Sequence, residues 1–137
     1  MTLEQVAGGF GDGVNKVVLV VSDDPHLRAA ILAALGAAGH SHHVVSSAAA
    51  ARGVAATRAV NLALVDAALP DGDPVILGQH LGQERRIPFL LLADDAEPEI
   101  LQRAIAAGAF NVLLKPSAIT QLRLAVDVAL VRARANY

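Results

Sequence analysis

The sequence contains no cysteine and no tryptophan, and only 3% of its 137 residues are aromatic. A chain without cysteine has no disulfide, no thiolate metal ligand and no cysteine nucleophile, which fits a reducing cytoplasm. With so few aromatic side chains it lacks a stacking platform for bases, and no basic stripe compensates. We therefore expect an aliphatic core and no direct binding of nucleic acid.

The sequence also has no long apolar run, and its first residues do not resemble a secretory signal. No apolar run approaches the roughly 20 residues that a membrane-spanning helix needs. The first residues carry Glu4 and Asp12 instead of a basic start followed by an apolar stretch. We expect a cytoplasmic protein with no membrane segment, and the glycines of residues 8–13 predict that residues 1–15 form a flexible arm.

The whole chain is 54% hydrophobic, and after residue 15 it alternates between two patterns. Short apolar runs predict strands, and apolar residues spaced three or four apart predict helices. The predicted strands cover 16–21, 42–46, 61–66, 87–92 and 110–114, and the predicted helices cover 25–38, 48–57, 75–84, 98–108 and 117–134. This alternation predicts one α/β domain over residues 16–137, with a parallel sheet between helices.

Charged residues follow three of the predicted strands. Asp66 ends the apolar run of NLALVDAALPDGD (61–73), Asp23 follows the first strand, and Lys115 follows the last. The carboxyl ends of parallel strands lie along one edge of a sheet, so we expect these three side chains to share a rim. Because a residue before proline favours extended geometry, we expect Lys115 to lie outside the helix that follows. The alternative is that all three are ordinary solvated loop residues.

Two carboxylates and an amine at one rim suit phosphoryl chemistry. One or two carboxylates, with waters and phosphate oxygens, are enough to hold Mg²⁺. A lysine binds a phosphoryl oxygen as a point charge. If one carboxylate is also a nucleophile, the product is an aspartyl phosphate, with the metal and the lysine offsetting the charge of the entering group.

Four segments together carry a family resemblance: VVSDDPHLR, LVDAALPDGD, IPFLLLAD and AGAFNVLLKP. Over residues 16–134 the chain resembles the CheY-like receiver domains of bacterial two-component response regulators. The resemblance implies a flavodoxin-like five-stranded parallel sheet of order 2-1-3-4-5, with helices on both faces.

The resemblance also implies roles for individual residues. By position, Asp66 matches the phosphoacceptor, Asp23 the second acid of the metal pair and Lys115 the lysine that contacts the phosphoryl group. Ala68 matches the residue whose backbone carbonyl completes the Mg²⁺ shell. The implied partners are a histidine kinase or phosphotransfer protein and a downstream target or output domain, reached through the fourth and fifth helices.

Four positions depart from the family pattern. Ser22 stands where the first acid of the metal pair is usual, and Pro74 replaces a common glycine. The switch positions, which usually carry a hydroxyl and an aromatic ring, are Ala93 and Val112. We therefore expect that Asp66 can be phosphorylated, but that the response is muted or follows another route.

Two other interpretations remain open. A degenerate receiver would act as an interaction module that needs no phosphorylation, as Ser22, Ala93 and Val112 suggest. A small enzyme or nucleotide binder is disfavoured because the chain lacks a glycine-rich phosphate loop and an acid/base pair, so we expect no enzyme.

The last predicted helix carries two apolar stripes. The first suits the sheet, whereas the second either tucks under a loop or forms a homodimer or partner interface. The first consists of Ile119, Leu122, Val126, Ala129 and Ala133, and the second of Leu124, Val128 and Val131.

Overall fold

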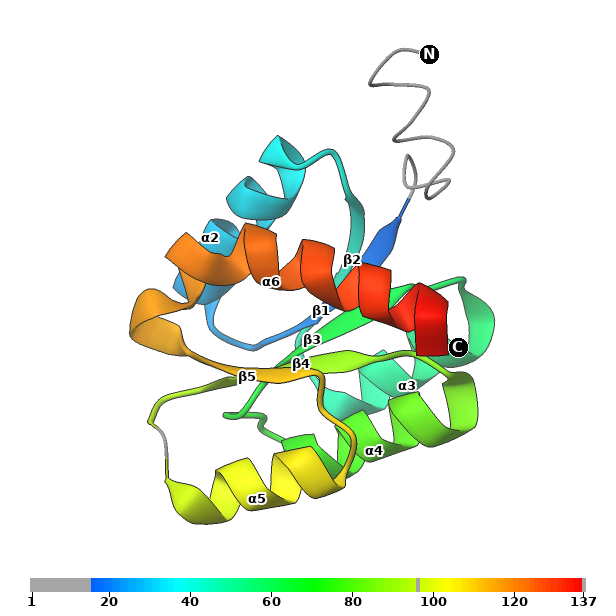
Figure 1. Cartoon of the computed structure of the whole chain (residues 1–137), viewed down its shortest axis with the longest axis vertical. Coiled ribbons are helices and arrows are strands. Elements are labelled where there is room, and N and C mark those ends of the chain that lie inside the picture. Colours follow the sequence, from blue (N-terminus) through cyan, green and yellow to red (C-terminus); the bar gives the residue numbers. More distant parts are fainter. Residues whose placement is uncertain (1–15, 96, 137) are drawn as a thin grey trace.

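A computed structural model describes residues 16–95 and 97–136, so the predicted arm at residues 1–15 lies outside the described part. Five parallel strands form one sheet of order β2-β1-β3-β4-β5 (Figure 1), which confirms the predicted fold. The strands are Val17–Val21 (β1), Ser41–Val45 (β2), Leu62–Asp66 (β3), Phe89–Ala93 (β4) and Asn111–Leu114 (β5). The helices are Pro25–Ala37 (α2), Ala48–Thr57 (α3), Pro74–Arg85 (α4), Pro98–Ala106 (α5) and Lys115–Asn136 (α6).

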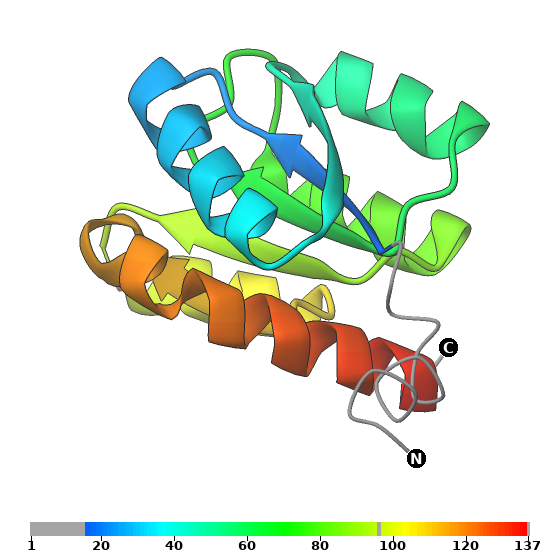
Figure 2. The same ribbon diagram turned by 90° about the horizontal axis from the view of Figure 1, so that it is seen from above.

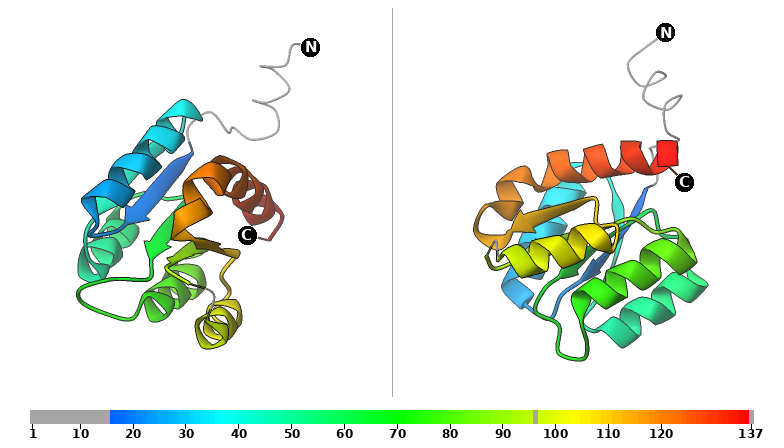
Figure 3. Two further views of the ribbon diagram at one scale, coloured as in Figure 1. Left: turned by 90° about the vertical axis from the view of Figure 1, so that its left-hand side faces the viewer. Right: turned by 60° about the horizontal axis from the view of Figure 1, so that its bottom comes forward.

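Helices cover both faces of the sheet. The side chains of α2 and α6 pack on one face, and those of α3, α4 and α5 pack on the other. Figure 2 looks onto the layer of α2 and α6, and Figure 3 shows the two layers from further sides. Neighbouring residues of a strand point to opposite faces of the sheet. Because helices cover both faces, residues at both positions must be apolar. This explains why β3 (LALVD) and β4 (FLLLA) are buried along their whole length.

Aspartates cap the N-termini of two helices. The Asp24 carboxylate accepts hydrogen bonds from the backbone N–H groups at the start of α2, and Asp73 does the same at the start of α4. In both helices a proline, Pro25 or Pro74, occupies the first position, where its missing N–H would have had no intrahelical acceptor. Each cap contributes roughly 1 kcal/mol and fixes a helix N-terminus near the carboxyl edge of the sheet.

The start of the last helix corrects one prediction. Lys115 is the first residue of α6 and directly follows β5, so the prediction that it lies outside the helix was wrong. The preference of a residue before proline is overridden here because Pro116 falls in the first helical turn, where proline is tolerated. Elsewhere the predicted ends agree with the structure to within about two residues, the usual uncertainty of helix and strand ends.

The two stripes of α6 are confirmed. Leu122 and Val126 are fully buried against the sheet, whereas Leu124 and Val131 are exposed. None of the helices in residues 16–95 and 97–136 combines the length and the apolar content of a membrane span.

Candidate functional site

Asp66 ends β3 and is buried, with 1% of its surface exposed. Three donors hold its carboxylate. Oδ1 lies 2.6 Å from Lys115 Nζ and accepts a hydrogen bond of 2.9 Å from the Ala68 N–H, while Oδ2 accepts one of 2.8 Å from the Ser22 hydroxyl. A buried carboxylate is stable only when it is paired and hydrogen-bonded, and these donors meet that need.

Lys115 joins the end of β3 to the loop after β4. Its Nζ also lies 3.3 Å from Oδ1 of Asp94, and the lysine side chain is only 16% exposed. Burial lowers the pKa of Lys115, but the hydrogen bonds and negative charges of Asp66 and Asp94 outweigh burial and raise the pKa above its usual 10.5. Lys115 is therefore a fixed positive charge at neutral pH. The structure thus brings Lys115 and Asp66 together, as the sequence predicts.

Ser22 directly follows β1 and has no exposed surface. Its hydroxyl oxygen accepts a hydrogen bond of 3.1 Å from the Asp24 N–H while the hydroxyl donates to Asp66. The sequence marked Ser22 only as a missing acid. In the fold it links the Asp66 carboxylate to the start of α2.

Asp23 follows Ser22 at the same edge of the sheet. Its side chain is exposed and forms no ion pair with any residue in the described ranges. Asp23 therefore lies at the same edge as Asp66, but it is not one of the groups that hold the Asp66 carboxylate.

The donors at this edge meet the minimum that Mg²⁺ requires. Within the described residues the Asp23 carboxylate has no ion pair. Oδ2 of Asp66 accepts one hydrogen bond of a possible two, and the Ala68 carbonyl is a further oxygen donor nearby in the chain. One or two carboxylates suffice when waters fill the other positions. Residues 16–95 and 97–136 contain no group of three or more acidic or histidine side chains that could hold a metal.

The loop between β3 and α4 is tied to α3 by Asp71. Its carboxylate accepts hydrogen bonds from the Ala48 N–H (2.7 Å) and the Ala49 N–H (3.0 Å) at the start of α3. These two hydrogen bonds are the main reason that the pKa of Asp71 is lowered. Sequence reasoning missed this contact, although the LPDGD motif contains the residue.

Asp73 ties the same loop to α4 and α5. Besides capping α4, its carboxylate forms an ion pair with Arg103 of α5. Burial raises the pKa of Asp73, but the hydrogen bonds from Arg103 and from the helix amides outweigh it, so the pKa is lowered overall. The loop that carries Ala68 is therefore fixed to three helices.

The two switch positions carry apolar side chains. Ala93 is the last residue of β4, buried at 2% exposure, and lies opposite Leu114 of β5. Val112 of β5 is half-buried and packs in the cluster on the face of α3, α4 and α5. Neither offers a hydrogen-bonding group beside the network of Asp66 and Lys115.

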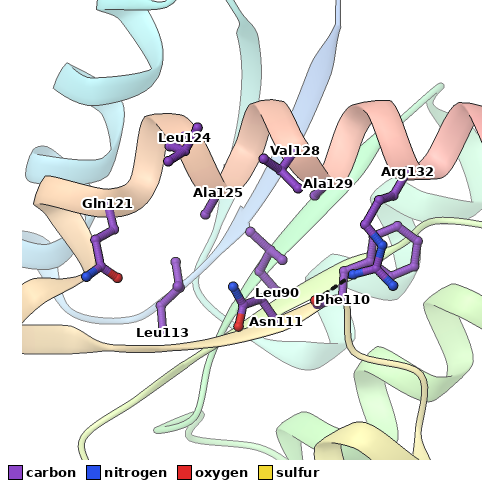
Figure 4. Close-up of a pocket in the computed structure, with 10 residues that line it drawn as sticks. All are labelled: Leu90, Phe110, Asn111, Leu113, Gln121, Leu124, Ala125, Val128, Ala129 and Arg132. Atoms are coloured by element: carbon purple, nitrogen blue, oxygen red, sulfur yellow. Dashed lines mark hydrogen bonds between the residues drawn. The ribbon is translucent and has the colours of Figure 1, made fainter.

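A groove of about 380 Å³ lies between α6 and β5 (Figure 4). At one end Arg132 donates a hydrogen bond of 3.0 Å to the Phe110 carbonyl, and its guanidinium lies 4.4 Å from the centre of the Phe110 ring. Leu124 and Val128 of the exposed stripe line the groove, whereas Asp66 and Lys115 do not. The groove is therefore separate from the Asp66 site.

Comparison with known proteins supports the same family. The profile of the response regulator receiver domain matches residues 18–127. The chain is 34% identical over 121 residues to the KDP operon transcriptional regulatory protein KdpE of Escherichia coli (strain K12), covering 87% of this chain and 53% of KdpE. It is 30% identical over 113 residues to the response regulator protein PilR of Pseudomonas aeruginosa, covering 82% of this chain and 25% of PilR. The chain thus spans about half of KdpE and a quarter of PilR.

Solved structures agree on the fold. A CheY-like response regulator receiver domain protein from Methanospirillum hungatei JF-1 superposes with a TM-score of 0.82 at 22% identity, covering 89% of this chain and 98% of the other. The receiver domain of the Francisella response regulator 1452 gives 0.78 at 24% identity, with 86% and 98% covered.

Proposed function

Because this chain belongs to the response regulator receiver domains of two-component signalling, we propose that it accepts a phosphoryl group on Asp66 from a histidine kinase or phosphotransfer protein. The observation that carries the proposal is the contact of 2.6 Å between Lys115 Nζ and Oδ1 of the buried Asp66. A positive charge beside Asp66 supports the proposal, because it would offset the negative charge of an entering phosphoryl group.

In the proposed transfer, Oδ2 of Asp66 attacks phosphorus through its remaining lone pair. The new P–O bond forms as the P–N bond of the donor phosphohistidine breaks, and the electron pair of that bond stays on the imidazole nitrogen. Lys115 turns from Oδ1 to a phosphoryl oxygen, since its ammonium group is a point charge on a flexible side chain. Mg²⁺, held by Asp23, Asp66 and the Ala68 carbonyl, would offset further charge on the phosphoryl oxygens.

Intact-mass measurement after treatment with acetyl phosphate tests the proposal. We expect the wild type to gain the mass of one phosphoryl group and Asp66→Asn to gain none. An unlabelled wild type, or equal labelling of Asp66→Asn, would refute phosphorylation at this residue. Amide shifts on titration with Mg²⁺ and beryllofluoride report binding of a phosphoryl mimic independently.

We further propose that the signal leaves through protein contacts of the fourth and fifth helices, α5 and α6. Support comes from the exposed apolar stripe of α6, in which Leu124, Val128 and Val131 are 71%, 49% and 68% exposed. The partner is a downstream protein or output domain, or a second copy of the chain. Light scattering over a range of concentrations tests self-association, and Leu124→Gln should abolish any that is found.

One set of observations favours a second candidate function. The switch positions Ala93 and Val112 lack the usual polar and aromatic groups, and Asp66 is already satisfied by three donors. These features suit a constitutive interaction module, acting in the cytoplasm like the leading candidate and likewise without enzymatic activity. Partner binding that is unchanged by Asp66→Asn would favour this module.

A further inference from the structure

The hydrogen bonds at Asp66 leave one position of its carboxylate open. A carboxylate has about four lone-pair sites on its two oxygens. Lys115 and the Ala68 N–H occupy both sites on Oδ1, and the Ser22 hydroxyl occupies one site on Oδ2. A cation and an attacking oxygen lone pair would therefore compete for the single remaining site, unless a donor moves away.

The direction of the Ser22 hydroxyl is fixed by its surroundings. Ser22 is fully buried, and its oxygen accepts the Asp24 N–H at 3.1 Å. With that acceptor position filled, the hydroxyl hydrogen is directed to Asp66, at 2.8 Å between oxygens. Ser22 thus presents a positive partial charge to Asp66 where a carboxylate would present a negative one.

The net charge of the buried site differs accordingly. Buried Asp66 and Lys115 neutralise each other, and Ser22 adds no charge. The second acid beside Lys115, Asp94, is 74% exposed and lies outside the buried site. An acid in place of Ser22 would put a second negative charge beside Asp66, and two carboxylates at that distance cannot both stay ionised without a compensating cation. The site as built needs no such compensation.

We propose that Ser22 is a positioning residue that takes the place of a cation at Asp66, holding Oδ2 of the carboxylate so that the site is assembled without Mg²⁺ and binds the ion weakly. This inference rests on the proposed function, because it concerns how the phosphoacceptor is held. The inference makes Ser22 an active hydrogen-bond donor to Asp66, and not only a position at which the usual acid is missing.

Two variants of almost equal size separate charge from shape. Ser22→Asp introduces a carboxylate, and Ser22→Asn introduces an amide that can still donate to Asp66. Melting temperatures are measured on the full chain in EDTA and in about 10 mM Mg²⁺ at matched ionic strength. We expect Mg²⁺ to shift the wild type and Ser22→Asn by less than about 1 °C, and to raise Ser22→Asp by about 3 to 5 °C.

In EDTA, Ser22→Asp should also melt below Ser22→Asn, since its two carboxylates repel each other. Equal Mg²⁺ shifts in Ser22→Asp and Ser22→Asn, or a wild-type shift as large as that of Ser22→Asp, would overturn the proposal. A merely structural role of Ser22 would lower both variants equally and would leave the Mg²⁺ dependence unchanged.

If Ser22→Asp does not fold in either condition, an NMR titration of the wild type decides. Amide shifts of Asp23 and Ala68 that saturate with a Kd for Mg²⁺ below about 5 mM would overturn weak binding, and a larger Kd supports it. Phosphoryl labelling of the wild type is independent of these readings. A protein that is labelled but binds Mg²⁺ tightly keeps the proposed function and loses this inference. A protein that is unlabelled but binds Mg²⁺ weakly loses the proposed function and keeps Ser22 as the donor that replaces a cation.

Discussion

The ends of β3 and β4 lie side by side in the sheet but are built differently. β3 ends in a buried carboxylate that is bound by a hydroxyl, a backbone N–H and an amine. β4 ends in Ala93, whose side chain forms no hydrogen bond and is equally buried. In the proposed function, the end of β3 would accept the phosphoryl group, whereas the end of β4 lacks a hydroxyl that could contact it. The comparison predicts that acceptance of a phosphoryl group and transmission of the signal can be altered separately, one at each strand end.

The largest expected effect tests the β3 end. Lys115→Met removes the amine but keeps an unbranched side chain, so Asp66 is left as a buried charge without its ion-pair partner. Breaking a buried pair on one side is strongly destabilising, and we expect the free energy of unfolding to fall by about 3 kcal/mol. Urea denaturation of the wild type and of Lys115→Met measures this difference in the free energy of unfolding.

A double variant provides the control. Asp66→Asn removes the charge that Lys115 neutralises, so Lys115→Met should be far less harmful when added to Asp66→Asn. A double-mutant cycle isolates this coupling. Additive losses would show that Lys115 stabilises the domain through packing and not through Asp66.

The next effect tests the β4 end. Ala93→Thr supplies the missing hydroxyl, whereas Ala93→Val adds almost the same bulk without it. A hydrogen bond to a charged acceptor contributes ~1.5 to 3 kcal/mol, compared with ~5.5 for moving a two-state equilibrium nearly from one end to the other. We expect Ala93→Thr to enlarge the beryllofluoride-induced amide shifts in α5 and α6. An equal increase of these shifts in Ala93→Val would show that the added bulk, and not the hydroxyl, is responsible.

The same two strand ends show what the sequence could and could not predict. The apolar run of β3 and the alternation of strands and helices determined the sheet and placed Asp66 and Lys115 on one rim. The pairings of Asp71 with the start of α3 and of Asp73 with Arg103 were missed, because they depend on the path of a loop and not on periodicity. Ser22 was identified by its position, but its role as a donor required the geometry of the folded site.

High pH should weaken the β3 end alone. The pKa of Lys115 is raised above 10.5 in the folded protein, so its contribution to stability is fully present below pH 10.5 and is lost as the pH rises through the folded pKa. We expect the free energy of unfolding to fall in this range more steeply for the wild type than for Lys115→Met. Chemical denaturation at several pH values measures the two slopes, and parallel slopes would contradict the assignment.

The smallest expected effect on stability concerns a connection from the end of β3 to α5 that bypasses the end of β4. Asp73 and Arg103 connect the loop after Asp66 directly to α5, without involving Ala93 or Val112. Arg103→Gln should lower stability by only about 0.2 to 1 kcal/mol, because the pair is partly exposed. The free energy that the pair contributes is present above pH 3.8 and is lost as the pH falls through the lowered pKa of Asp73.

If this pair carries the response, Arg103→Gln should reduce the beryllofluoride-induced shifts in α5 and leave phosphoryl labelling of Asp66 intact. Arg85→Gln is the matched control, since it makes the same charge change at the far end of α4, where Arg85 forms no ion pair among residues 16–95 and 97–136. Reduced shifts in both variants would indicate a general effect of charge. A loss confined to Arg103→Gln would mean that the loop after β3 reaches α5 by itself, so that an apolar end of β4 need not silence the domain.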